Sequence, residues 1–160
     1  MIVVSDTSPI SNLATVGKLD LLQQIYGDVI IPETVYQEII NAGATEPATL
    51  AIQNLKWIKK GSVNNLTLVM SLQEKLDPGE AEAIILALEL KADLLIVDER
   101  KGRKEATKMG LQITGTLGVL LKAKKLGLIS LIKPILDDLI NSGFWVSSEI
   151  YQQVLALVEE

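Results

Sequence analysis

Four carboxylates stand at positions where a parallel α/β sheet would bring them together. Two of them, Asp6 and Asp98, come shortly after the apolar runs 1–4 and 94–97, which have the length of buried strands. In open parallel sheets, ligands bind beyond the carboxyl ends of the strands, so acids placed there are expected to face a cleft. Glu38 and Glu80 lie on helices predicted at 33–41 and 78–91. The four acids together predict one acidic site.

The chemistry open to such a site is limited by the residues that the chain lacks. There is no histidine and no cysteine among the 160 residues. Any bound metal must therefore sit among oxygen ligands, which suits Mg²⁺ or Mn²⁺ and disfavours structural zinc. An all-oxygen acidic site in a parallel sheet points to metal-dependent phosphodiester chemistry.

Each acid also has a plainer interpretation. Asp6, which small hydroxyl residues follow, is either a metal ligand or a helix cap. Glu38 lies mid-helix, where a glutamate is usually solvated. Glu80 comes three residues after Asp77, which is the spacing of a capping box. Asp98 directly follows a fully apolar run, and its alternative role is to cap the next helix.

Charged and hydroxyl residues next to these acids are candidate accessory groups. Glu99 is either a further metal ligand or a solvated side chain. The basic run after it could hold an RNA phosphate backbone beside a metal site, or it is a solvated helix face. The residues that we assign to RNA binding are Arg100, Arg103 and Lys104. Thr116 opens a later helix, whose N-terminal amides could bind phosphate, although small residues at a helix start need no function.

The elements that position these residues alternate between strand and helix, which predicts an α/β fold with helices on both faces of a mostly parallel sheet. About four or five short strands are expected. Their predicted positions are 1–4, 29–31, 57–59, 94–97 and 111–114. The predicted helices are 9–14, 18–26, 33–41, 46–55, 66–75, 78–91, 101–109, 117–125, 129–141 and 148–158. We expect Pro134 to interrupt the helix at 129–141.

Composition favours one domain over residues 1–160. Apolar residues make up 48% of the chain but aromatic ones only 4%, so aliphatic side chains must fill the core. No apolar run approaches a membrane span, and the N-terminus lacks the basic and apolar regions of a signal peptide, which favours the cytoplasm. The net charge of −5 argues against a broad nucleic-acid-coating surface. Local basic patches or a basic partner protein remain compatible with it.

Five segments of the chain resemble a known family. In order they read SDTSPISNL, VIIPETVYQEII, LDPGEAEAIILALEL, LLIVDERKGRKEA and ITGTLGVLLKAKKLGLI. Their order and spacing resemble the PIN domain, in a subfamily similar to the VapC-type toxin ribonucleases. The likeness covers most of residues 1–133, and the final helices resemble those of one uncharacterised PIN subfamily. It implies a three-layer α/β/α sandwich on which the C-terminal helices, at about 129–160, also pack.

The resemblance also implies an activity. In the family, acids at four such positions bind the metal for RNA hydrolysis, and they match Asp6, Glu38, Glu80 and Asp98. It further implies a homodimer and, for a toxin, a basic antitoxin as partner. Two departures stand out. The third acid is commonly aspartate in VapC-like toxins, and no hydroxyl residue is obvious beside the fourth acid, although Thr7 or Thr116 could take that role.

Two other functions stay open. Magnesium-dependent phosphoryl transfer also uses aspartates at strand ends, but the Asp-x-Asp nucleophile pair of dehalogenase-like proteins is missing, because Ser8 follows Asp6 at that spacing. A catalytically weak PIN-like interaction module would keep the fold without the activity. Failure to bind a divalent metal would favour that module.

Overall fold

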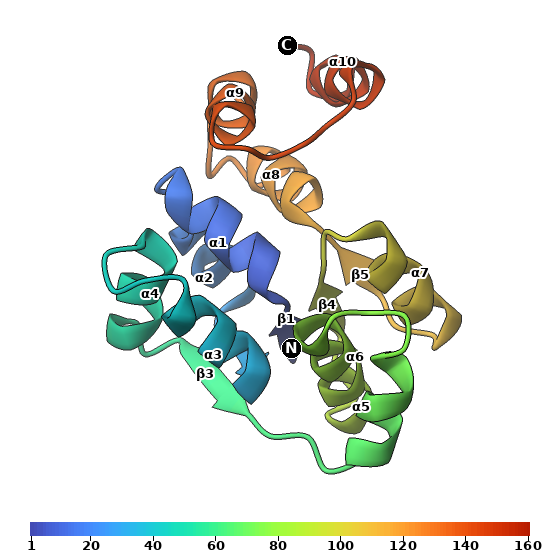
Figure 1. Cartoon of the computed structure of the whole chain (residues 1–160). Coiled ribbons are helices and arrows are strands. Elements are labelled where there is room, and N and C mark those ends of the chain that lie inside the picture. The colour runs from blue at the N-terminus through green and yellow to red at the C-terminus, as the bar shows by residue number, and fades with distance from the viewer.

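A five-stranded parallel sheet forms the centre of the computed structural model, which describes all of residues 1–160 (Figure 1). The strands are β1 Val3–Ser5, β2 Val29–Pro32, β3 Ile58–Gly61, β4 Leu94–Ile96 and β5 Ile113–Thr114. Their order across the sheet is β3-β2-β1-β4-β5, and every neighbouring pair is parallel. The chain therefore builds the sheet outward from β1 to one side and then returns to build the other side from β4. The point between β1 and β4 is where open α/β sheets bind their ligands.

Ten helices complete the fold. Their bounds are α1 Thr7–Thr15, α2 Asp20–Tyr26, α3 Glu33–Asn41, α4 Pro47–Asn54, α5 Leu66–Leu72, α6 Pro78–Glu89, α7 Arg100–Lys108, α8 Thr116–Lys125, α9 Lys133–Asn141 and α10 Ser148–Leu157. None of them is long and apolar enough to cross a membrane.

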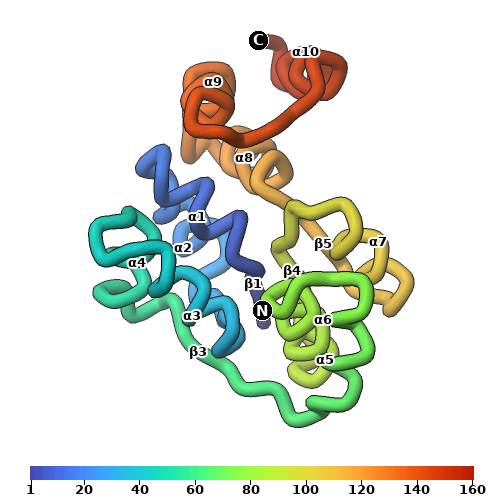
Figure 2. Tube along the Cα trace, viewed as in Figure 1, coloured from blue at the N-terminus to red at the C-terminus, as the bar shows by residue number.

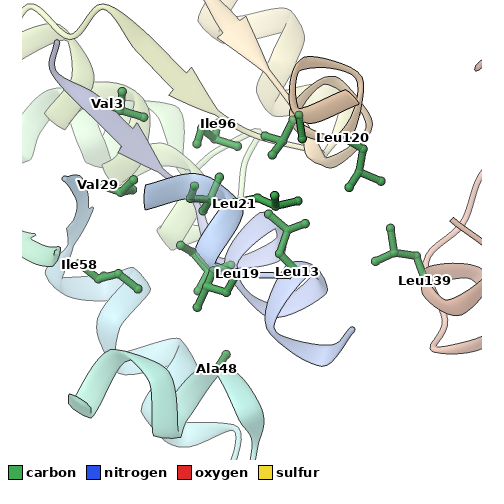
Figure 3. Close-up of a cluster of buried hydrophobic side chains, with 14 of the residues drawn as sticks. Val3, Leu13, Leu19, Leu21, Val29, Ala48, Ile58, Ile96, Leu120 and Leu139 are labelled. Carbon is green, nitrogen blue, oxygen red and sulfur yellow. The ribbon is translucent and has the colours of Figure 1, made fainter. Parts of the chain in front are cut away.

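Successive residues of the central strands β1 and β4 bury their side chains on opposite faces of the sheet, as the period of two requires. Val3 and Ile96 belong to one hydrophobic cluster, whereas Val4 and Leu95 belong to the other. The first cluster takes residues from α1–α4 and α8–α10, and part of it is drawn in Figure 3. The second takes residues from α5, α6 and α7. The expected three-layer sandwich is confirmed, with a sheet that is parallel throughout.

The chain continues from α8 into the C-terminal helices α9 and α10, and Figure 2 shows this path as a trace. Ile135, Leu136 and Leu139 of α9 are buried in the same cluster as the sheet residue Val3. The expected interruption at Pro134 is wrong. The helix begins only at Lys133, so Pro134 lies in its first turn, where a missing N–H breaks no hydrogen bond.

The helix around Glu80 begins as its sequence predicts. Asp77 is the N-cap of α6, and its carboxylate accepts a hydrogen bond from the Glu80 backbone N–H at 2.9 Å. The Glu80 side chain in turn accepts from the Asp77 N–H, which completes the capping box. This reciprocal bonding fixes where α6 starts, and with it the position of the Glu80 carboxylate.

Candidate metal centre

Asp6 is a buried acid at the carboxyl end of β1. Only 4% of its surface is exposed, and although it is the N-cap of α1, its side chain makes no capping hydrogen bond. Burial raises its pKa to about 7, in spite of the nearby Thr7 backbone N–H, and the charges of Asp77, Glu38 and Asp98 add to the rise. The Asp6 carboxylate therefore does not cap α1.

Asp98 follows β4, next to β1 in the sheet, and its two oxygens are held by three donors. Oδ1 accepts from the Thr116 backbone N–H at 2.7 Å, and Oδ2 accepts from the Thr116 hydroxyl at 2.7 Å. The Asn12 amide of α1 donates to Oδ2 at 3.1 Å. Asp98 does not cap the following helix, because Glu99 is the N-cap of α7. Its carboxylate is instead anchored at the N-terminus of α8.

Glu38 is turned toward the other acids and away from bulk solvent. It is half-buried on α3, and its Oε2 accepts a hydrogen bond from the Thr7 hydroxyl at the start of α1. The N-terminal turn of α6 comes equally close. A Cβ atom on Gly79 would lie 2.6 Å from both carboxylate oxygens of Glu38. A side chain at this position would therefore require the Glu38 carboxylate to move.

Glu80 takes part in the predicted capping box and still has one carboxylate oxygen free. Its Oε1 takes part in the capping box, at a long 3.4 Å from the Asp77 nitrogen. Its Oε2 is buried and has no hydrogen-bond partner. Burial, followed by the charges of Asp77 and Asp6, raises the pKa of Glu80 to about 8. A Cβ atom on Gly102 of α7 would lie 2.6 Å from the free Oε2, so α7 also approaches this oxygen closely.

Three residues at the site were not chosen from the sequence. Asp77 was recognised only as a cap, yet its charge contributes to the raised pKa of both Asp6 and Glu80. Asn12 holds Asp98 across 86 positions of sequence, and no local pattern marks such a contact. Glu82 accepts from the N–H and the hydroxyl of Thr34, at 3.1 and 2.5 Å. It thereby ties the start of α3 to α6 and brings Glu38 toward Glu80.

The donor set fits a hard divalent cation. All available side-chain ligands are oxygens, and Glu80 Oε2 is a buried carboxylate oxygen without a partner, which is costly unless a cation or a proton satisfies it. No three carboxylates are arranged to hold one metal ion directly. Mg²⁺ usually keeps several waters and takes one or two carboxylates, so a complete protein cage is not required.

The basic residues of α7 divide between two clefts. Arg100 and Arg103 line a cleft of about 800 Å³ together with Asp98 and the exposed Glu99. The Arg103 guanidinium donates to the backbone carbonyl of Val97 at 2.9 Å, which holds it beside the strand end. The third predicted RNA-binding residue is placed elsewhere. Lys104 lines a separate cleft of about 450 Å³ with Lys101 and Lys108.

Comparison with known protein families agrees with the fold. A family model for the PIN domain matches residues 2–160, which is almost the whole chain. No curated protein matches the chain closely enough to count as a relative. The family match covers the sheet, all four acids and the C-terminal helices. The chain therefore belongs to the PIN-domain family, whose fold is of the nuclease type.

Proposed function

We propose that this protein is a metal-dependent endoribonuclease that uses Mg²⁺ or Mn²⁺. The observation that carries the proposal is the partnerless, buried Oε2 of Glu80, on a carboxyl whose pKa the nearby charge of Asp6 helps to raise. Two acids whose ionised forms are disfavoured in the protein alone gain most from a cation. Their place beside the switch point between β1 and β4 supports a ligand at the same location.

Each of the four acids has a distinct role in this proposal. Asp6 and Glu80 provide the charge that binds the cation, and Thr7 orients Glu38 toward them. Asp98 is pre-oriented by Thr116, so it can bind with little loss of side-chain freedom. A bound divalent ion would lower the pKa of a water and stabilise the charge of the phosphate transition state. Glu99, exposed in the cleft, is an accessory position for an outer water.

Two arginines of α7 would position the RNA. Arg100 and Arg103 share the cleft with Asp98, so a phosphate bound by them would lie next to the acids. Lys104, in the second cleft, would bind the strand farther along its path. The chain has no histidine, so proton transfer in this site depends on water and carboxylates.

The finer biological role is also a proposal. We infer a cytoplasmic toxin of the VapC type that acts as a homodimer and is silenced by a basic antitoxin. The net charge of −5 favours a basic partner, because opposite charges steer the encounter of two proteins. Co-purification with a basic protein encoded next to it, and release of activity when that protein is removed, would support this role.

The direct test combines metal binding with RNA cleavage. We would measure thermal unfolding of wild type and Asp98→Asn with and without Mn²⁺, and assay RNA cleavage in the same buffers. Glu46→Gln is the matched control, since this exposed carboxylate lies before α4 and makes no capping hydrogen bond. We expect Mn²⁺ to stabilise wild type and Glu46→Gln, and only these two to cleave RNA. If Mn²⁺ stabilises none of them and RNA stays intact, an inactive interaction module replaces the nuclease.

A further inference from the structure

The segment between α9 and α10 forms part of the wall of the cleft that contains Asp98. Residues 143–147 line it together with α7 residues and with Leu117 and Gly118 of α8. Trp145 in this segment is 82% exposed. The other tryptophan, Trp57, is only 8% exposed and packs in the core. Packing in the core therefore explains the presence of Trp57 but not that of Trp145.

The rest of the cleft combines apolar residues with polar ones, and it contains two arginines and two acids. Arg100 and Arg103 enter from α7, and Ser8 and Asn12 enter from α1. The acids in the wall are Asp98, whose oxygens already accept three hydrogen bonds, and the solvent-facing Glu99. At about 800 Å³ the cleft lies within the range of about 300–1,000 Å³ that is usual for small-ligand sites.

An exposed indole in the same cleft as two arginines matches the way proteins bind unpaired nucleotides. Base–aromatic stacking and arginine–phosphate contacts are the two interactions that single-strand sites combine. A duplex would leave the indole without a stacking partner, because the faces of the duplex bases are already stacked inside the helix. The indole, the two arginines and Asp98 all line this one cleft.

We propose that Trp145 stacks on a base of single-stranded RNA while Arg100 and Arg103 bind its phosphate. This inference rests on the proposed nuclease function for the identity of the ligand, and it adds the subsite that selects unpaired RNA. The C-terminal segment thus supplies a binding residue to a centre whose acids all come from the first 98 residues. The expected preference is for an unpaired strand, without readout of a particular base.

The test measures binding apart from catalysis. A roughly ten-nucleotide oligoadenylate is titrated into the metal-free protein in chelator, with the same strand in duplex form as comparison. We expect quenching of tryptophan fluorescence by the single strand and weaker binding of the duplex. Trp145→Ala should weaken single-strand binding about ten- to a hundredfold, whereas Trp145→Tyr should retain most of it. Unfolding temperatures of both variants should equal that of wild type, because the side chain is exposed.

Cleavage assays with Mn²⁺ separate this inference from the nuclease proposal. Trp145→Ala should raise KM for single-stranded RNA and leave kcat close to the wild-type value. Equal binding of RNA by wild type and Trp145→Ala would overturn the stacking role, as would equal binding of single strand and duplex. Loss of dimerisation in Trp145→Ala with unchanged RNA binding would identify the indole as a subunit contact instead. Absence of cleavage in every sample contradicts the nuclease proposal alone, since the chelated binding assay still decides the stacking.

Discussion

At the scale of single residues, the centre is defined by two acids that are buried before any cation arrives. Asp6 and Glu80 have pKa values raised to about 7 and about 8, chiefly by burial. At a pH between the ordinary and the raised pKa values, these carboxyls are protonated in the folded, metal-free protein and ionised in the unfolded chain. This proton uptake on folding makes stability and metal binding depend on pH in a direction that can be stated beforehand.

The metal-free protein should lose stability as pH rises from about 4 to about 8. Both carboxyls are protonated in either state below their ordinary pKa, so the folded state is not penalised there. Above their ordinary pKa, the two carboxyls ionise in the unfolded chain but stay protonated in the folded one. The free energy of unfolding therefore falls until the pH exceeds the raised values. Urea unfolding in chelator across this range measures the slope. Asp6→Asn should flatten it, and an equal slope in both proteins would contradict the assignment.

Glu80→Gln isolates the charge of one acid from its structural role. Glutamine can keep the capping box, because its amide oxygen also accepts from the Asp77 N–H. We therefore expect the variant to unfold at an equal or higher temperature than wild type near pH 8 without metal. It should lose the stabilisation that Mn²⁺ gives to wild type, as calorimetric titration and thermal unfolding can show. Unchanged Mn²⁺ affinity would remove Glu80 from the set of ligands.

The sequence marks those site residues that follow a buried strand or that match a family motif. Asp6 and Asp98 belong to the first kind, because an acid that follows a buried parallel strand lies at the edge of the sheet where ligands bind. Asp77 and Asn12 act through contacts that depend on how α6 and α1 pack against the sheet. Local patterns contain no information on such packing, so these two could be found only in the folded molecule.

At the scale of elements, helix starts bring the acids together. The first turn of α6 meets Glu38 of α3 at Gly79, and Glu82 further joins these helices through Thr34. Most of the ten helices could be predicted from apolar periodicity and from caps such as Asp77. The distance between two helices is set by side-chain volume at their contact, and the sequence does not display it.

Gly79→Ala should therefore disturb the site more than the helix. Alanine in an early helical turn is ordinarily favourable by about 0.5–1 kcal/mol relative to glycine. Here its Cβ would lie 2.6 Å from the Glu38 oxygens, so the Glu38 carboxylate must leave its place between α3 and α6. We expect weaker Mn²⁺ binding and lower stability in the single variant, and recovery of stability when Gly79→Ala is combined with Glu38→Ala. A double-mutant cycle in denaturant measures this coupling, and simple additivity would contradict the close contact.

Helix α7 exposes cations to two clefts, and the two should contribute unequally to RNA binding. Arg100 lies beside Asp98, whereas Lys104 lies in the second cleft. We expect Arg100→Ala to weaken binding of single-stranded RNA and to reduce the salt dependence by about one phosphate contact. Lys104→Ala, a matched loss of one positive charge, should have the smaller effect. Affinities measured at several salt concentrations in chelator provide the comparison, and a larger effect of Lys104→Ala would assign the RNA to the second cleft.

At the scale of the whole molecule, the strand order brings residues far apart in sequence to one point. Strand β1 pairs with both β2 and β4. Asp6 and Asp98 therefore follow neighbouring strands, although 92 positions of sequence separate them. The alternation of strands and helices predicted a parallel sheet. It did not predict the order β3-β2-β1-β4-β5, which depends on where each crossover packs.

The final helices share the main hydrophobic cluster, and from this we propose that residues 1–160 unfold as one domain. Ile132, Leu136 and Leu139 are almost fully buried there, so α9 cannot leave without exposing the cluster. Circular dichroism follows all ten helices, whereas the fluorescence of Trp57 follows the region next to β3. In Trp145→Phe, where only Trp57 reports, we expect the two signals to give one melting temperature. An earlier transition in circular dichroism alone would show that the C-terminal helices form a separate unit, and the cleft wall that carries Trp145 would then be movable relative to the acids.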